Sequence, residues 1–511
     1  MKKRGLVFFT FFIGVIVLSN AQENKRPNVI VVLADDIGVG DISYYRNLHK
    51  GKVVLETPNI DKLANQGTTF TNAHAPAALC ATSRYSIMTG NSNYRSPKPW
   101  GVWSGYAATE ITKEQISLGR LMKKANYHTA FLGKWHMGMS FAKKSNPNEI
   151  YEIAGKKSNI NVDLSKIVDG GPATHFFDYS FTLPSGIQNE PYAAFENSKW
   201  YPLQKNSEIA FVDNVFMERI GSELEKKAGL GDSNWNPSKI GPLLANKAVN
   251  FIADKAKSDK PFFMYYCSQA VHTPHMASEE LNGVKIAGTT PSRHMDMIKE
   301  LDVQVGMMVE ELKKQGIYEN TVFIFTSDNG GLHVDGDTWN VGHEPSDIYR
   351  GKKNDPYEGG HRVPFFAVWP NHIKAKQTIS YPVIGLDILA TIAAAAEYKI
   401  PNTEALDSYN LLPLLTGVEK KPSRQNILVQ GGTGREAIII EGDWKLIIQI
   451  DKKDQTNQKR KPIALFNLKS NPTEDEQKNL IAVKKYQKKV KKLFANYNQT
   501  RDSKISTGKH F

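Results

Sequence analysis

Carboxylate and amide side chains stand at the ends of two apolar stretches of the sequence. Asp35 and Asp36 directly follow the run NVIVVLA, and Asp328 and Asn329 directly follow TVFIFTS. Continuous β-branched runs of this kind indicate buried parallel strands, and sites in open α/β sheets form where such strands end. The first pair alone could be a helix cap and a turn. Together, three carboxylates and one amide oxygen make a hard oxygen site that suits Ca²⁺.

A second reactive group lies in the run CATSRYSIMTG at 80–90. A lone cysteine is most often a packed core residue, and a lone arginine most often lies on a solvated face. The residues after Cys80 are predicted to form the first turn of a helix, where free N–H groups and the helix dipole favour an anion. Arg84 comes four residues later and can return over the same face.

These groups belong to a set of motifs that resemble those of the type I sulfatases of the alkaline-phosphatase-like superfamily. The motifs occur here in the family's order. The run at 80–90 resembles Cys-x-Pro/Ala/Thr-Ser-Arg followed by Thr-Gly, with Thr82 where the family most often has proline. The other matching runs are the Asn-x6-Asp-Asp-x-Gly opening at 28–38, GKWHMG at 133–138, HTPH at 272–275, SDNG at 327–330 and RGKKNDPYEGGHRVP at 350–364.

The resemblance implies a nucleophile that the genetic code does not supply. In the family the cysteine matched by Cys80 is oxidised after translation to formylglycine, which requires a maturation enzyme as a partner during biosynthesis. A sulfate ester is a monoanion that repels anionic nucleophiles. One hydroxyl of the hydrated aldehyde can attack sulfur, and the other can later be deprotonated to expel sulfate.

The resemblance also assigns a role to each matched residue. The implied ligands of one Ca²⁺ are Asp35, Asp36, Asp328, Asn329 and residue 80. The implied catalytic residues are Cys80, Arg84, His136 and His272, with His272 as the acid for the departing alcohol and His136 as the base for the second hydroxyl. The implied substrate-binding residues are Lys134, Lys353 and His275.

Several alternatives remain open at this point. The chain has two cysteines, Cys80 and Cys267, which an exported protein might join as a disulfide. The pair His272 and His275 could bind zinc, although no cysteine or third histidine is near in the sequence. A phosphatase or phosphonate hydrolase of the same superfamily is the closest alternative activity. A non-catalytic glycan-binding protein with the same fold is the other class.

The pattern of elements predicts an α/β fold with a large, mixed and mainly parallel sheet sandwiched by helices. Helix-to-strand patterns occupy 57–74 and 116–138, and further helices are expected near 242–256, 292–316 and 387–396. A smaller C-terminal α+β subdomain follows, with four strand-like runs between 427 and 468 and a basic amphipathic helix at 483–497. The expected division is a signal peptide at 1–21, a catalytic domain at 22–420 and a C-terminal subdomain at 421–511.

Composition and the amino terminus bear on location and partners. The chain has 511 residues, 40% of them hydrophobic and 23% charged, which is typical of a globular protein. A basic start, a short apolar run and a small-residue cleavage site before Gln22 predict export to the periplasm or the medium. That run is too short to span a membrane, so no stable membrane insertion is expected. The net charge of +13 comes without a basic-aromatic recognition motif, so no nucleic-acid partner is expected.

An exported enzyme with aromatic residues in the loop at 93–110 suggests a sulfated polysaccharide, or its oligosaccharides, as the substrate. Those aromatic side chains could stack on sugar rings, and packing within the loop explains them equally well.

Overall fold

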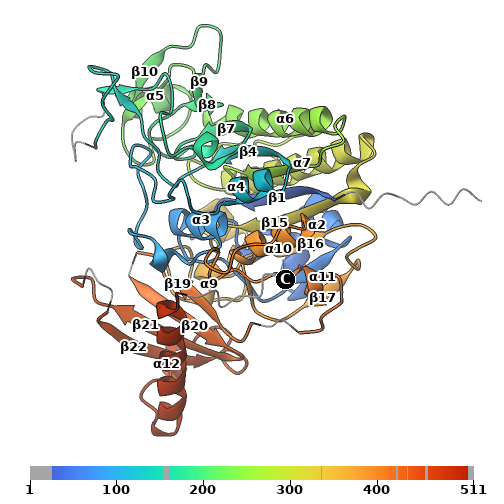
Figure 1. Ribbon diagram of the computed structural model, residues 1–511, viewed down its shortest axis with the longest axis vertical. Helices are drawn as coiled ribbons and strands as arrows, with labels where there is room; N and C mark the ends of the chain where they lie inside the picture. Colours follow the sequence, from blue (N-terminus) through green and yellow to red (C-terminus); the bar gives the residue numbers. More distant parts are fainter. Residues whose placement is uncertain are drawn as a thin grey trace, which may run out of the picture.

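The computed structural model describes residues 26–153, 160–334, 336–421, 424–433, 435–454 and 458–504. A ten-stranded mixed sheet crosses the larger part of the molecule (Figure 1) in the order β17-β2-β16-β15-β1-β12-β4-β7-β8-β9. Its five central strands, from β15 to β7, are parallel. The strands are β1 (Asn28–Ala34), β2 (Thr68–Phe70), β4 (His128–Lys134), β7 (Tyr179–Leu183), β8 (Ala194–Glu196), β9 (Lys199–Tyr201), β12 (Phe262–Cys267), β15 (Thr321–Ser327), β16 (Phe365–Val368) and β17 (Gln377–Ile379).

Helices cover both faces of this sheet, so its central strands are buried on both sides. On one face lie α3 (Cys80–Thr89), α4 (Leu118–Lys124) and α10 (Asp387–Ala395). On the other lie α1 (Ser43–Leu48), α2 (Pro58–Ala64), α6 (Pro237–Lys255) and α7 (Arg293–Lys314). Alternate residues of β1 belong to the two cores, with Val31 facing α3 and Val32 facing α7. The predicted α/β fold is therefore confirmed.

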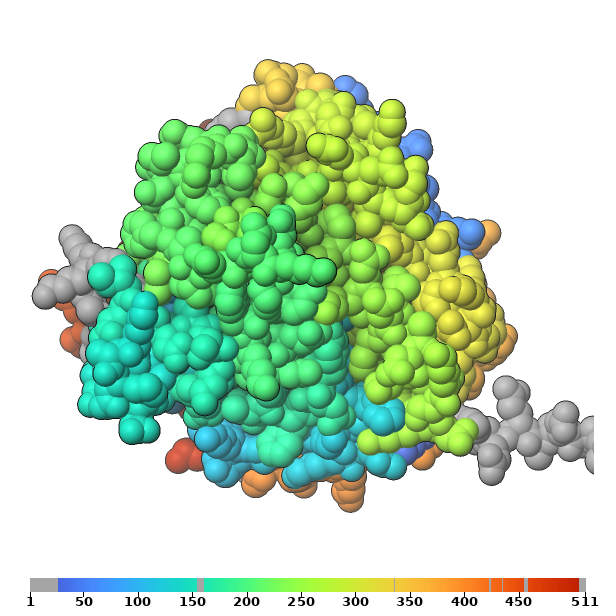
Figure 2. Space-filling model, turned by 90° about the horizontal axis from the view of Figure 1, so that it is seen from above, coloured from blue at the N-terminus to red at the C-terminus, as the bar shows by residue number. Residues whose placement is uncertain are grey.

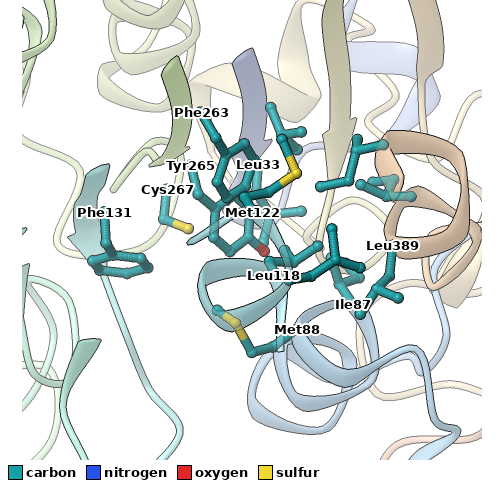
Figure 3. Close-up of a cluster of buried hydrophobic side chains, with 14 of the residues drawn as sticks. Leu33, Ile87, Met88, Leu118, Met122, Phe131, Phe263, Tyr265, Cys267 and Leu389 are labelled. Atoms are coloured by element: carbon teal, nitrogen blue, oxygen red, sulfur yellow. The ribbon is translucent and has the colours of Figure 1, made fainter. Parts of the chain in front are cut away.

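The core on the α3 face is built from strand and helix side chains that interdigitate (Figure 3). Leu33, Phe263 and Tyr265 come from the strands, Ile87 and Met88 come from α3, and Leu389 comes from α10. All six are nearly inaccessible to solvent. This packing fixes α3 against the carboxyl ends of the central strands, which is where the candidate site lies.

Capping residues explain where the long helices begin. Ser292 precedes α7 and accepts a hydrogen bond from the Met295 N–H, and Asn236 does the same for Ser238 at the start of α6.

Figure 2 shows the face formed by the green and yellow segments, which include α6 and α7. The shorter elements are β3 (Ala73–His74), β5 (Ala142–Lys143), β6 (Val162–Asp163), β10 (Ile209–Val212), β11 (Gly229–Asp232), β13 (Glu280–Leu281), β14 (Val284–Lys285), β18 (Val383–Ile384), α5 (Asn214–Arg219), α8 (Asp337–Asn340), α9 (Glu358–His361) and α11 (Leu412–Leu415).

A smaller antiparallel sheet follows towards the carboxyl terminus (Figure 1), as predicted. Its strands are β19 (Ile427–Gln430), β20 (Glu436–Glu441), β21 (Trp444–Ile450) and β22 (Arg460–Asn467), and α12 (Gln487–Asp502) packs on it. The predicted helix start at Val483 is wrong, because that residue precedes a single 3₁₀ turn and α12 begins only at Gln487.

The small sheet is joined to the large domain through its first strand. The Gln430 N–H donates to the Pro76 carbonyl at 2.9 Å, and the Ala78 N–H donates to the Gln430 carbonyl at 2.9 Å. The segment that leads into Cys80 therefore adds to the edge of the C-terminal sheet, although the two lie far apart in the sequence.

Three other expectations concern regions outside the two sheets. The predicted signal peptide at 1–21 lies outside the described residues. Among the described helices, none is both long and apolar enough to cross a membrane. Within the loop at 93–110, Trp103 and Tyr106 are buried in the core, which favours packing over sugar stacking for these two. The domain boundary at 420 stays a prediction.

Candidate active site

The carboxylates at the ends of β1 and β15 meet because the two strands are parallel neighbours in register. Ala34 pairs with Ser327, so the residues that follow each strand lie side by side. Ligand atoms of Asp35, Asp36 and Asp328 all lie within 4.8 Å of one another, and all three side chains are buried. The two strand ends therefore converge on one acidic cluster, as the sequence predicted.

The amide of Asn329 completes this cluster with an unused oxygen. Its Nδ2 donates to Asp36 Oδ1 at 2.9 Å, and among the described residues its buried Oδ1 has no hydrogen-bond partner. A buried acceptor without a donor is rare, and this one lies beside three carboxylates. These residues fit a hard divalent cation.

Three basic side chains pair with the three carboxylates. Lys134 Nζ lies 2.7 Å from Asp35 Oδ2, and Lys353 Nζ lies 2.7 Å from Asp36 Oδ1. The third partner is Arg84 of α3, whose Nε donates to Asp328 Oδ2 at 2.8 Å.

Burial and these pairings move the carboxyl pKa values in opposite directions. Burial outweighs the Lys134 ammonium and raises the pKa of Asp35 to about 7. Burial also opposes ionisation of Asp36, but Lys353 and His272 hold the pKa of Asp36 below its usual range. The same acidic motif thus holds two carboxyl groups with different proton affinities.

Cys80 is the first residue of α3 and is 2% exposed. Its Sγ lies 3.3 Å from His136 Nδ1. Burial raises the pKa of the thiol, so the unmodified cysteine is not an activated thiolate. Arg84 lies one turn further along α3 and holds both Asp328 and the Lys134 carbonyl.

The two histidines of the sequence motifs reach the site from different loops. Strand β4 ends at Lys134, and two residues later His136 has a left-handed φ of 55°, so the strand does not continue through the GKWHMG motif. His272 Nε2 lies 3.7 Å from Asp36 Oδ2. Burial, followed by the nearby lysines, lowers the pKa of both His136 and His272 well below the ordinary value.

His275 lies in a different environment. Its ring packs edge-on against His294 with the centroids 5.1 Å apart. His294 and its neighbour His343 are buried in the same region as Asp41. Asp41 follows the Asp35–Asp36 pair closely, but the spacing of the two histidines gives no signal that they would join it.

Comparison with known proteins identifies the family. The family model described as Sulfatase matches residues 27–398. The chain belongs to the sulfatase family. Over 496 residues the sulfatase is 30% identical to the N-acetylgalactosamine-6-O-sulfatase of Bacteroides thetaiotaomicron, covering 89% of this chain and 90% of that protein. It is 29% identical to human arylsulfatase A, covering 79% of this chain and 70% of the relative. The chain is a sulfuric ester hydrolase.

Solved structures agree with this placement. One, from work on the metabolism of multiple glycosaminoglycans by B. thetaiotaomicron, superposes on the sulfatase with a TM-score of 0.77 and 27% identity, over 94% of this chain and all of that one. The structure of PsFucS1 sulfatase from Pseudoalteromonas sp. gives a TM-score of 0.68 at 24% identity, over 94% of this chain and 91% of that one, and shares the fold.

The second cysteine of the sulfatase lies outside the site. Cys267 is on β12 within the core of Figure 3, and both cysteines are free and buried. The structure therefore has no Cys80–Cys267 disulfide, and the thiol of Cys80 is not used up in a cross-link.

Proposed function

We propose that this sulfatase is an exported enzyme, periplasmic or secreted, that removes sulfate esters from a sulfated polysaccharide or its oligosaccharides. Formylglycine at position 80 would be the nucleophile and one Ca²⁺ the cofactor. The observation that carries the proposal is the placement of Cys80. Its Sγ lies 3.3 Å from His136 at the amino end of α3, whose Arg84 is bonded to the acidic cluster.

The four oxygen-bearing side chains Asp35, Asp36, Asp328 and Asn329 would hold the cation, with residue 80 completing the set. When bound, Ca²⁺ supplies positive charge that offsets the charge of the sulfate oxygens. The maturation enzyme that makes formylglycine is the partner required during biosynthesis. The support for the cation is the cluster of three carboxylates and the unsatisfied Asn329 oxygen.

The chain's own side chains divide the remaining work. Lys134 and Lys353 would bind sulfate oxygens, since both ammonium groups already lie at the acidic cluster. Arg84 would hold the ligand carboxylate Asp328 and charge near residue 80. His136 Nδ1 would take a proton from residue 80, because it is within reach of that side chain.

His272 would protonate the departing alcohol. A sulfate ester bound beside the imidazole favours its protonated form and opposes the pKa depression caused by burial and the lysines. The predicted role of His275 in substrate binding stays a prediction, and its surroundings suggest the different role argued below.

The carbohydrate substrate is supported by the relatives. One relative is named an N-acetylgalactosamine-6-O-sulfatase, and the solved structure at 27% identity comes from work on glycosaminoglycans. Phosphonate or phosphate monoester hydrolysis is the alternative activity. A non-catalytic glycan-binding protein is disfavoured, because Cys80, His136 and both lysines are all present in one site.

The test is sulfate release from a panel of sulfated glycans, with phosphate and phosphonate esters tested in parallel. The enzyme is produced with its maturation enzyme, and peptide mass spectrometry measures the aldehyde at residue 80. Cys80→Ala should abolish sulfate release. The matched control is Cys267→Ala, which removes the other buried thiol and should retain activity. Full activity of Cys80→Ala, or of protein in which residue 80 is still an unmodified cysteine, would show that formylglycine is not the nucleophile.

A further inference from the structure

A second cluster of metal-ligating side chains lies outside the proposed calcium site. It consists of Asp41, His275, His294 and His343, and we call it the histidine cluster. Asp41 ends a 3₁₀ turn after β1, His275 follows β12, His294 is in the first turn of α7, and His343 follows α8. Asp41, His294 and His343 are at most 3% exposed.

Three members of the histidine cluster bring their ligand atoms together, and the ring of the fourth, His275, packs on His294. Asp41, His294 and His343 each offer one ligand atom, and these atoms lie within 4.8 Å of one another. His343 Nε2 is 2.8 Å from Asp41 Oδ1, while Asp41 Oδ2 accepts a hydrogen bond from the Gly38 N–H at 2.8 Å. The carboxylate is thus oriented by the backbone on one side and faces the imidazoles on the other.

Two imidazoles of the cluster have unused nitrogens. Within the described chain, neither ring nitrogen of the buried His294 has a hydrogen-bond partner. The buried Nε2 of His275 has no partner either. Buried polar atoms are rarely left unpaired, so three orphaned nitrogens in one place indicate a missing ligand.

A comparable cluster elsewhere in the molecule has its partner. His74, Glu358 and His361 also bring their ligand atoms within 4.8 Å. Lys445 Nζ lies 3.0 Å from Glu358 Oε1 and 3.2 Å from His361 Nε2. A buried ammonium therefore supplies the positive charge there, whereas no lysine or arginine is bonded to the histidine cluster in the described chain.

We propose that the histidine cluster binds one Zn²⁺ ion through Asp41, His294 and His343, with His275 as the fourth ligand. Imidazole nitrogens with one carboxylate favour zinc, whereas Ca²⁺ prefers oxygen ligands only. Ligand atoms of a tetrahedral zinc lie about 3.3 Å apart, so the side chains must draw together by small rotations. A zinc-bound Nε2 of His343 carries no proton, so the neutral ring holds its proton on Nδ1 and the hydrogen bond to Asp41 gives way to the metal bonds.

The ion would tie the proposed active site to two other segments. Asp41 lies five residues after the calcium-site residue Asp36, and His275 lies three residues after His272. The chain after His343 already packs closely on the loop that carries Asp41. In that contact the Gly40 N–H donates to the Pro345 carbonyl at 2.8 Å. A Cβ at Gly40 would lie 1.8 Å from the Glu344 carbonyl oxygen. Zinc would hold these loops in place without contacting the substrate.

The test measures metal content and stability of the full chain, with no need for activity. The protein is stripped of metal with a chelator, incubated with ZnCl₂ in the presence of CaCl₂, and dialysed. Bound zinc is then measured by elemental mass spectrometry. We expect about one zinc per chain and a zinc-dependent rise in melting temperature. His294→Gln should lose both. The control is His372→Gln, which removes an exposed histidine and should keep both.

Two further measurements make the result decisive. Asp328→Ala should keep zinc while losing calcium, which separates this proposal from the proposed function. Co²⁺ added to the stripped wild-type protein should give the intense visible absorption of four-coordinate cobalt, and this needs no variant to fold. The proposal is wrong if the wild type holds no more zinc than His294→Gln, if zinc is lost with Asp328→Ala, or if cobalt gives only the weak six-coordinate spectrum.

Discussion

Lys445 Nζ of β21 lies 3.0 Å from Glu358 Oε1 in α9, with both side chains fully buried. The same ammonium lies 2.7 Å from Glu474 Oε1. The C-terminal sheet therefore inserts a positive charge between two buried carboxylates, one of which is also bonded to Arg362 of the large domain. The pairing explains why burial does not keep Glu358 protonated, since Lys445 and Arg362 together hold its pKa well below the usual range.

Lys445→Met should destabilise the whole protein. It leaves two acidic groups buried without their ammonium, and breaking a buried ion pair from one side costs about 3–5 kcal/mol. Denaturant unfolding would measure the loss. Lys461→Met, at an exposed position of the same sheet, should change stability by about 0.5 kcal/mol or less. Equal effects of the two substitutions would show that the buried ion pairs of Lys445 do not stabilise the protein.

Asp328→Ala should remove calcium binding and activity. It deletes one proposed ligand and also the partner of Arg84, so the comparison is made within each variant, with and without calcium. Wild type should gain about 2.7 kcal/mol at a calcium concentration 100 times the dissociation constant, and the variant should gain nothing. Asp443→Ala removes an exposed carboxylate and should behave as wild type. A calcium-dependent melting shift that survives in Asp328→Ala places the ion elsewhere.

His272→Ala should lose activity in proportion to the basicity of the leaving group. A sugar alkoxide must be protonated as the S–O bond breaks, and removing a general acid costs on the order of 10²–10⁴-fold. Nitrophenolate leaves without help, so the loss on nitrophenyl sulfate should be much smaller if wild type accepts that substrate. Steady-state kinetics on both substrates would measure this.

Lys353→Ala is the matched control for His272→Ala. A residue that binds only sulfate affects both substrates alike, since both carry the same group. An equal loss on the two substrates in His272→Ala would rule out the acid role.

The stability of the protein should fall as the pH drops below about 6.5. His175 is stacked on Trp135, and burial lowers the pKa of His175 to about 4. Between pH 6.5 and 4 the unfolded chain binds a proton there and the folded chain does not, so acid favours unfolding. His175→Phe should flatten this part of the stability-pH curve, measured by urea unfolding. His372→Phe, an exposed substitution, should leave the slope unchanged.

Most of what positions the acidic cluster could be predicted from the sequence. The runs before Asp35 and Asp328 are β-branched and continuous, which is the pattern of strands buried on both faces. Their convergence then follows from the rule that sites form at the carboxyl ends of such strands. Lys353 could be assigned from the sequence because it lies five residues before Glu358, the spacing found in the family motif.

What could not be predicted depends on contacts between distant segments. His343 meets Asp41 across 302 residues, and no periodicity or spacing indicates that pairing. No third histidine is near His272 and His275 in the sequence, which argues against zinc there, yet His294 packs against His275 in space. Lys445 likewise has the sequence pattern of an ordinary strand residue, and only the packing of the two sheets shows its partner.

The burial of Cys80, next to the segment that bonds to Gln430, has a consequence for biosynthesis. Once β19 has closed on Pro76 and Ala78, the residue 80 side chain is 2% exposed. An oxidising enzyme must reach the sulfur, so the proposed conversion has to be finished before the chain reaches this folded state. A molecule that folds first would remain a thiol for its lifetime. The active fraction of any preparation would then depend on the rate of oxidation relative to the rate of folding.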